Sequence, residues 1–588
     1  MLSYILLFLS TISFLSRGRT LRIESKIYSL IITSSLFSYS ILGLISLIII
    51  NLNKSKFPIV AISSLIFLLS FFFNKNSLET YSKIKNFLLY EFIKCKNDLK
   101  NLSQKFYIIL ISFLVILVTL SSLGPINHPD ALDYHVGYPY QFWLRGRFFV
   151  DGGLHQALMG AGDYANLALI QEKSIWLIRY IQISNLPLIT IFLLNNVKNK
   201  LYILAFISSS TFIQWGTIGK PLFLSESSCA IAYIIWKEYK DNLSRRLLLV
   251  CIFSCISIKI SSLIVCTPIL IDIFFDNFFN KKIHNEKNLI KFLKSIIFDK
   301  SILLSIIVLL GILFTRIKIV GNFAYPLLTN IFNKNDILIN NFTEFISGYQ
   351  KDGLFPLNIF LPISISDIAS SLGPGLFLIL LFLIFKTLKQ INIKENKLFY
   401  ICLMQIILLI LFCQGRADYY ALPMILLIYF SDNLDQINKN TFLKLTLHLS
   451  IYFQILLIIG FLLFSINQNL LSILDYEKTM TKTSYGFDFS RLINQKTPGN
   501  FYQNVIRDAR LFYPNNYISR EMMDRCFQNN SQNICFEKYD ITQILSAKDF
   551  LLGKEKYYCH RETFTSGARN PFNRKKREIE VCEKKKFT

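Results

Sequence analysis

Long apolar runs alternate with short lysine-rich segments over the first 466 residues of the chain. A membrane-spanning helix takes roughly 20 mainly apolar residues, and many of these runs approach that length. The runs, in chain order, are Leu2–Ser16, Tyr28–Ile50, Phe57–Phe73, Phe106–Leu123, Ser174–Leu194, Leu201–Trp215, Leu222–Trp236, Ile302–Phe314, Ile368–Phe385, Leu398–Phe412, Tyr419–Phe430 and Leu445–Ile466. The pattern predicts an all-α polytopic membrane protein with about 14 transmembrane helices.

One further apolar stretch, Arg246–Phe275, is too long for one span and short for two. Lys259 lies in its middle, where a charged side chain would be costly inside a bilayer. We therefore expect a pair of half-helices that meet at the outer surface.

The lysine-rich segments predict the orientation of the chain. They cover residues 74–105, 237–246, 280–300, 386–397 and 439–444, and the predicted spans place all of them on one side. Cytoplasmic loops are enriched in Lys and Arg, so the polar segments 124–163 and 316–362 should be extracytoplasmic. Three regions follow: residues 1–105 with three spans and a basic linker, a core at 106–466, and an extracytoplasmic soluble region at 467–588.

Composition agrees with a membrane protein. Of the 588 residues, 52% are hydrophobic and 17% charged, and the mean hydropathy is +0.42. These values exclude a soluble cytosolic enzyme, a disordered scaffold and a small secreted disulfide domain. The formal charge of +25 lies mostly between apolar runs. It should therefore set topology and meet anionic lipid headgroups of the bilayer, with no role in binding nucleic acid.

Four of the 11 cysteines lie in the polar C-terminal region, at Cys526, Cys535, Cys559 and Cys582. In an oxidising compartment, four thiols predict two disulfides, and the sequence leaves the three possible pairings open. Free thiols or a weak metal site are the alternatives.

Chemistry-bearing residues gather in the segment 124–164. It holds three of the six histidines and four aspartates: His128, His135, His155, Asp130, Asp133, Asp151 and Asp163. Such a group offers a general base, a metal ligand or both. The simpler alternative is a hydrated loop whose aspartates cap helices.

The order of residues in this segment resembles a known catalytic loop. Asp130 comes four residues before Tyr134, and Pro139, Trp143 and Gly146 follow. This is similar to the first extracytoplasmic loop of the GT-C superfamily of lipid-linked-sugar glycosyltransferases, which includes bacterial aminoarabinose transferases and protein O-mannosyltransferases. On that resemblance Asp130 takes the catalytic acidic position. Asp133 replaces a usually non-acidic residue, and the two could exchange roles.

Four later segments resemble further GT-C loops in the same order. They are 215–227 with Lys220 and a displaced acidic residue, Glu226; the tip around Lys259; 318–332; and 414–423 with Arg416 and Tyr419. Three of these residues also have a simpler interpretation. Lys259 would reach the membrane surface, Arg416 would pair with Asp418, and Glu226 would cap a helix.

The resemblance implies a GT-C-like bundle and a function. A sugar would pass from a polyprenyl-phosphate donor to a glycan, lipid or protein acceptor at the outer face of a bacterial inner membrane, in one step with inversion. Asp130 or Asp133 would be the general base. The substrate-binding residues would be Tyr134, His135, Lys220, Glu226, Lys259, Arg416 and Tyr419. A divalent ion held by Asp130 with His128 or His135 is a further hypothesis. The rival classes are a transporter or flippase for lipid-linked glycans and a glycan polymerase or ligase.

Overall fold

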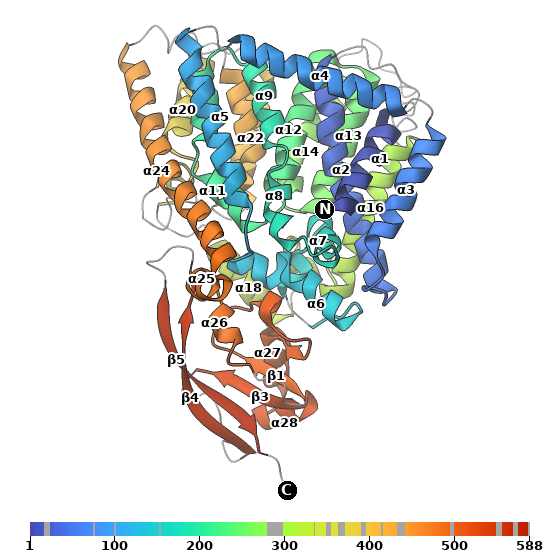
Figure 1. Ribbon diagram of the computed structural model, residues 1–588, viewed down its shortest axis with the longest axis vertical. Coiled ribbons are helices and arrows are strands. Elements are labelled where there is room, and N and C mark those ends of the chain that lie inside the picture. Colours follow the sequence, from blue (N-terminus) through green and yellow to red (C-terminus); the bar gives the residue numbers. More distant parts are fainter. Residues whose placement is uncertain are drawn as a thin grey trace.

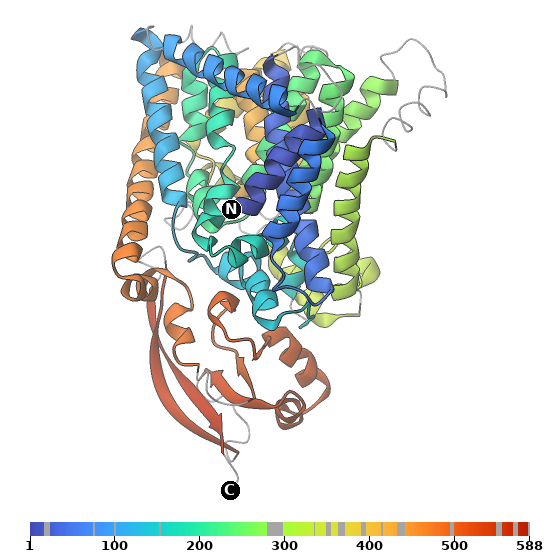
Figure 2. The ribbon, with the colours of Figure 1, turned by 45° about the vertical axis from the view of Figure 1, so that its right-hand side comes forward.

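A large helical bundle and a small C-terminal α/β domain make up the structure (Figure 1). The computed structural model describes residues 1–16, 24–74, 77–98, 102–151, 154–278, 298–333, 335–348, 354–362, 371–389, 396–412, 416–431, 441–493, 499–547, 556–568 and 574–585. In both views the C-terminal domain lies at one end of the bundle and the helix α4 at the other (Figures 1 and 2).

The bundle begins with five helices. They are α1 (Leu2–Ser16), α2 (Glu24–Asn51), α3 (Ile59–Phe73), α4 (Ser77–Asp98) and α5 (Leu102–Ser122). The basic linker is thus largely helical, and α4 lies across the end of the bundle (Figure 1). Leu88, Leu89 and Phe92 of α4 are exposed. With the lysines of the same helix, these side chains suit the surface of a bilayer.

The middle of the chain supplies the centre of the bundle. Its helices are α7 (Ala161–Gln171), α8 (Ile178–Gln182), α9 (Leu186–Asn196), α10 (Lys200–Ile207), α11 (Thr211–Ile218), α12 (Leu222–Tyr239), α13 (Asn242–Ile258) and α14 (Ser262–Phe278). The stretch around Lys259 forms two helices of 17 residues, α13 and α14, with Lys259 in the turn between them. This arrangement matches the helix pair expected from the sequence.

The last part of the bundle contains both long and short helices. They are α16 (Lys300–Val320), α17 (Thr329–Phe332), α18 (Ile337–Gly348), α19 (Leu357–Phe360), α20 (Pro374–Lys389), α21 (Lys397–Phe412), α22 (Ala421–Phe430) and α24 (Thr441–Leu474). The parts of the predicted spans and loops at 280–297, 363–370, 390–395, 413–415 and 432–440 lie outside the described residues.

Five helices among the described residues are long and apolar enough to cross a membrane, or seven if each of two bent pairs counts as one span. These long apolar helices indicate a membrane protein. The expected 14 spans are not confirmed. Several of the apolar runs form helices well short of the roughly 20 residues that a span takes, such as α1 with 15 residues and α22 with 10.

The segment 124–163, which the sequence predicts to be extracytoplasmic and which is called the outer segment below, is folded into the protein. It contains a π-helical turn at Ala131–His135, α6 (Gly137–Arg145) and a 3-10 turn at Leu154–Leu158. Gly160, near the end of the segment, packs against α13. A Cβ added to Gly160 would lie 1.9 Å from the carbonyl oxygen of Ile258. Only a glycine permits this approach. It brings the segment against the turn that carries Lys259.

The C-terminal domain is built on a five-stranded sheet in the order β2-β1-β3-β5-β4. Its strands are β1 (Asn500–Gln503), β2 (Tyr517–Ile518), β3 (Ile541–Ser546), β4 (Tyr557–Ser566) and β5 (Lys575–Lys584). The first three are parallel neighbours, and β5 is antiparallel to β3 and β4. The helices are α25 (Tyr476–Thr483), α26 (Phe487–Ser490), α27 (Arg520–Asn529) and α28 (Gln532–Lys538).

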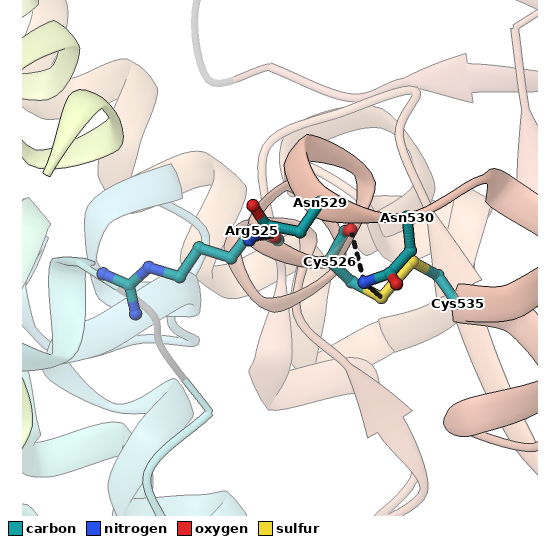
Figure 3. The surroundings of a disulfide bond; sticks show 5 residues. All are labelled: Arg525, Cys526, Asn529, Asn530 and Cys535. Atoms are coloured by element: carbon teal, nitrogen blue, oxygen red, sulfur yellow. Dashed lines mark hydrogen bonds between the residues drawn. A yellow bond between two sulfur atoms is a disulfide. The ribbon is translucent and has the colours of Figure 1, made fainter.

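Two disulfides hold this domain. Cys526 and Cys535 join α27 to α28 (Figure 3), and Cys559 and Cys582 face each other across β4 and β5. Each bond links elements that neighbour each other in the chain. Of the three pairings that the sequence left open, this is the one that the structure contains.

Candidate functional site

A pocket lined by both polar and apolar side chains opens where the bundle meets the C-terminal domain. Its empty space is about 930 Å³, including its open mouth. The polar lining residues are Asp130, Tyr134, His155, Lys220, Lys259, Ser261, Arg416, Tyr419 and Arg507. The apolar lining residues are Leu158, Ile260, Ile264, Pro326, Leu327, Phe342, Phe345 and Phe412. Four basic side chains and one carboxylate thus share a cavity with eight apolar side chains.

Six of the residues singled out in the sequence line this pocket: Asp130, Tyr134, Lys220, Lys259, Arg416 and Tyr419. They come from four segments that are far apart in the chain. Four others do not line it: His128, Asp133, His135 and Glu226. The structure therefore brings together most, but not all, of the predicted site.

Asp130 is the carboxylate of the pocket. Its Oδ1 accepts a hydrogen bond of 2.5 Å from Nη1 of Arg507, and its Oδ2 lies 3.7 Å from Nη1 of Arg416. Its backbone N–H donates to Nδ1 of His128 at 3.2 Å. Burial opposes ionisation of Asp130, but the positive charges of Arg507, His128, Arg416 and Lys220 outweigh it and hold the pKa well below its usual range. Asp130 is thus ionised at neutral pH.

Asp133 has a different environment, although it is only three residues away. It is 1% exposed and accepts hydrogen bonds from Arg510 and, at 3.2 Å, from Nε of Arg507. Nδ1 of His155 lies 3.4 Å from its Oδ2. Arg510 is equally buried and also pairs with Asp508 at 2.7 Å. Asp133 therefore ties the outer segment to the C-terminal domain.

Lys220 is fixed by the late loop of the bundle. Its Nζ donates to Oδ2 of Asp418 at 2.8 Å and to the hydroxyl of Tyr419 at 3.1 Å. The sequence had offered Asp418 as the partner of Arg416, whereas the structure gives Asp418 to Lys220 and places Arg416 beside Asp130. Positive charge from two loops is thus held in the lining of the pocket.

Lys259 lies in the turn between α13 and α14. Its Nζ donates to the carbonyl oxygen of Leu158 at 3.3 Å and lies 5.3 Å from the centre of the Tyr134 ring. Burial lowers the pKa of Lys259 to about 8, because Asp163 only partly offsets the loss of hydration. Lys259 is thus buried in the pocket wall and does not reach into bulk solvent, contrary to its simpler interpretation.

The three residues predicted to hold a divalent ion do not converge on one point. His135 is fully buried and shares a 2.6 Å hydrogen bond with Asp163, and burial lowers the pKa of its imidazole. His128 is directed to the backbone N–H of Asp130. The metal hypothesis therefore does not fit this arrangement. Over the described ranges, three candidate ligand atoms come within 4.8 Å of one another only at Cys229, Cys255 and Cys266, buried between α12, α13 and α14.

Glu226 lies in α12, 1% exposed and outside the pocket lining. Its Oε2 is 3.5 Å from the backbone N–H of Leu422, in the first turn of α22. The side-chain oxygen of Glu226 thus lies where the first turn of α22 leaves backbone N–H groups without helical partners. The capping interpretation of Glu226 therefore suits the structure better than substrate binding, and the capped helix is α22 rather than its own.

The sequence did not identify three residues that belong to the site. His155 and Arg507 line the pocket, and Arg510 binds Asp133 beside it. His155 had been counted in the outer segment, and its ring stacks on Tyr134 with 5.5 Å between centroids. The two arginines belong to the C-terminal region 467–588, to which the sequence assigns no residue of the site. The unbalanced aspartates of the outer segment were the one signal that could have pointed to them.

Comparisons with models of known protein families, with curated proteins and with solved structures found no match to this chain.

Proposed function

We propose that this chain is a membrane glycosyltransferase that transfers a sugar from a polyprenyl-phosphate donor to an acceptor hydroxyl at the extracytoplasmic face. The observation that carries the proposal is the mixed lining of the pocket. One carboxylate, Asp130, shares the cavity with four cations and eight apolar side chains. A sugar attached through phosphate to a long hydrocarbon chain needs all three features.

The basic residues suit the phosphate of the donor. Arg416 and Arg507 offer planar guanidinium groups that can bind phosphate oxygens in pairs, whereas Lys220 and Lys259 are point charges. Negative charge grows on the phosphate as its bond to the anomeric carbon breaks. Cations already held in a cavity stabilise that charge without reorganising.

The apolar lining residues suit the lipid chain of the donor. Phe342 and Phe345 of α18, Phe412 of α21 and Ile264 of α14 lie on different helices around the pocket. An isoprenoid chain buried there would gain about 25 cal/mol for each Å² of apolar surface removed from water. The long apolar helices of the bundle would place these side chains at the depth of the lipid chains in a bilayer.

Asp130 would act on the acceptor. The acceptor hydroxyl oxygen attacks the anomeric carbon and forms the new glycosidic bond, Asp130 takes the hydroxyl proton, and the bond to the phosphate oxygen breaks. The electron pair of that bond leaves with polyprenyl phosphate. Attack opposite the leaving group inverts the anomeric centre. The resemblance of residues 130–146 to the catalytic loop of GT-C enzymes supports the same role for Asp130.

The test is transfer by the purified protein in liposomes that contain radiolabelled polyprenyl-phosphate sugars and candidate acceptors. We expect labelled product with inverted anomeric configuration, and loss of product in Lys220→Gln. Lys318→Gln is the matched control, since Lys318 is basic but does not line the pocket. Movement of the labelled lipid across the bilayer without transfer would instead favour a flippase.

A further inference from the structure

Arg507 reaches the pocket from the C-terminal domain, whereas every other basic residue of the pocket comes from the bundle. Its guanidinium bridges two carboxylates of the outer segment. Nη1 donates to Asp130 at 2.5 Å and Nε to Asp133 at 3.2 Å. The C-terminal domain thus contributes one side chain directly to the candidate site.

The loop that carries Arg507 is held by its own domain. The buried amide of Gln503 donates to the carbonyl oxygen of Ile506 at 2.8 Å and to Asp508 at 2.7 Å, and its oxygen accepts from the N–H of Val505 and Ile506. The backbone N–H of Arg507 itself donates to the Tyr485 hydroxyl at 2.8 Å. The backbone at Arg507 is therefore held independently of the carboxylate partners of its side chain.

Arg507 and Arg510 differ in whether their guanidinium groups can bind a ligand in the pocket. Arg510 is 1% exposed and lies within 4 Å of four carboxylates, which are Asp133, Asp151, Asp508 and Glu521. The side chain of Arg507 is 33% exposed, and its Nη2 makes no hydrogen bond within the described part of the chain. Arg510 is thus enclosed by carboxylates and does not line the pocket, whereas Arg507 lines it and keeps a donor for an anion there.

The pair between Arg507 and Asp130 poses a chemical problem for the proposed transfer. A carboxylate that accepts a short hydrogen bond from a guanidinium is stabilised in its charged form and is a weak base. The acceptor hydroxyl must also reach an oxygen of Asp130, and Oδ1 is occupied by Arg507. A general base in this state needs to be released before it can act.

We propose that Arg507 is a phosphate-binding residue of the donor site, and that the donor phosphate draws it away from Asp130 so that the carboxylate is free to act as base only when donor is bound. This inference rests on the proposed function. It names the C-terminal domain as a working part of the site and makes base activation depend on the donor.

Charge and geometry favour the exchange. The phosphodiester of the donor carries one negative charge on two non-bridging oxygens, as a carboxylate does, and its charge grows as the anomeric bond breaks, so it can compete for a planar guanidinium. Arg416, 3.7 Å from Asp130, remains close enough to keep the carboxylate ionised. When the anomeric carbon–oxygen bond breaks, the electron pair moves onto the phosphate, where Arg507 now lies, and the acceptor proton moves onto Asp130.

The pH behaviour of Asp130 provides a readout that a structural role would not alter. The titratable groups that act on Asp130, besides Arg507, are His128, Arg416, Lys220, Lys259, Tyr134 and His135. Without Arg507 these cations offset burial less completely, and the pKa of Asp130 should rise toward or above the ordinary value of about 4. The acid limb of kcat/KM should therefore move to higher pH.

The experiment compares wild type with Arg507→Gln, Arg507→Lys and the control Arg525→Gln in liposomes. Arg525 also belongs to the C-terminal domain and reaches toward the bundle, 3.3 Å from Asp336, but it does not line the pocket (Figure 3). We expect Arg507→Gln to raise the KM for the donor about 10- to 100-fold, as for the loss of a hydrogen bond to a charged group. Its kcat/KM should also fall off below about pH 5.

Arg507→Lys should keep the acid limb of wild type and recover part of the donor affinity, and Arg525→Gln should resemble wild type. Transfer by Arg507→Gln with an unchanged donor KM and an unchanged acid limb would overturn the inference and leave the proposed function intact. Direct binding of radiolabelled polyprenyl phosphate separates the two claims if no donor is transferred. Weaker binding by Arg507→Gln than by Arg525→Gln would then uphold the phosphate contact, and equal binding would refute it.

Discussion

Asp130 and Asp133 are three residues apart in the outer segment, but only Asp130 lines the pocket, and their asparagine variants should differ in what they lose. Asparagine keeps the shape of the side chain but cannot accept a proton from an acceptor. Asp130→Asn should therefore lose about 10²–10⁴-fold in turnover, the usual contribution of a general base. By the transition-state relation this corresponds to about 2.7–5.5 kcal/mol of activation free energy.

The free energy of unfolding should respond in the reverse order. Arg507 is one-third exposed and keeps Asp133 as a partner when Asp130 is neutral, so Asp130→Asn should cost less than Asp133→Asn. Asp133 and Arg510 are both 1% exposed. Removing one charge of a buried pair costs about 3–5 kcal/mol, and the lower end applies because Arg510 keeps Asp508.

The assay measures transfer and thermal unfolding on the same purified preparations, the unfolding by fluorescence. Asp130→Asn should unfold closer to the wild-type Tm than Asp133→Asn does, with almost no transfer. Asp133→Asn should unfold several degrees below wild type while its folded fraction keeps much of its turnover. An inactive, fully stable Asp133→Asn beside an active Asp130→Asn would assign the base to Asp133. If both variants are stable and active, the proposed chemistry of this segment is wrong.

Three more predictions concern Lys259, Gly160 and a disulfide. The KM for the donor should rise as the pH increases above about 8, because Lys259 loses its positive charge there, and Lys259→Arg should move this rise to higher pH. Gly160→Val should abolish folding, measured as loss of monodisperse protein on gel filtration, because its Cβ would overlap the oxygen of Ile258 at 1.9 Å; normal elution would contradict the tight contact. Mass spectrometry of unreduced protein should find Cys526 linked to Cys535, and replacing both by serine should lower the stability of the C-terminal domain by about 2–4 kcal/mol.

The sequence indicated several polar residues of the site because the order of the motifs along the chain could be recognised even though the motifs lie far apart in it. Asp130, Lys220 and Arg416 were selected from short segments separated by long apolar runs, and all three line one pocket. The break at Lys259 could also be predicted, since a charged residue in mid-stretch is costly in a bilayer. Each of these inferences used charged residues beside or within apolar runs, where burying a charge costs a large free energy.

The number and length of the spans could not be predicted in the same way. Hydropathy measures whether a segment is apolar, and an apolar helix buried in the bundle has the same composition as one that faces lipid. α22 has only 10 residues, and nine of them are buried. The alternative of a hydrated loop at 124–163 does not fit the structure for the complementary reason. Polar side chains can indicate contact with water, whereas Asp130, Asp133 and His135 are buried against neighbouring side chains and the C-terminal domain.

The role of the C-terminal domain follows from a charge count that the sequence permitted. The outer segment has four aspartates and only two arginines of its own, Arg145 and Arg147. Carboxylates that fold into the protein need cations or hydrogen-bond donors, because burying an unpaired charge costs several kcal/mol. The missing cations had to come from another segment, and they come from Arg507 and Arg510, more than 370 residues later. Arg510 is buried among carboxylates and fixes the domain in place, and Arg507 keeps a donor open toward the pocket. A domain that served only to stabilise the protein would need Arg510 but not Arg507.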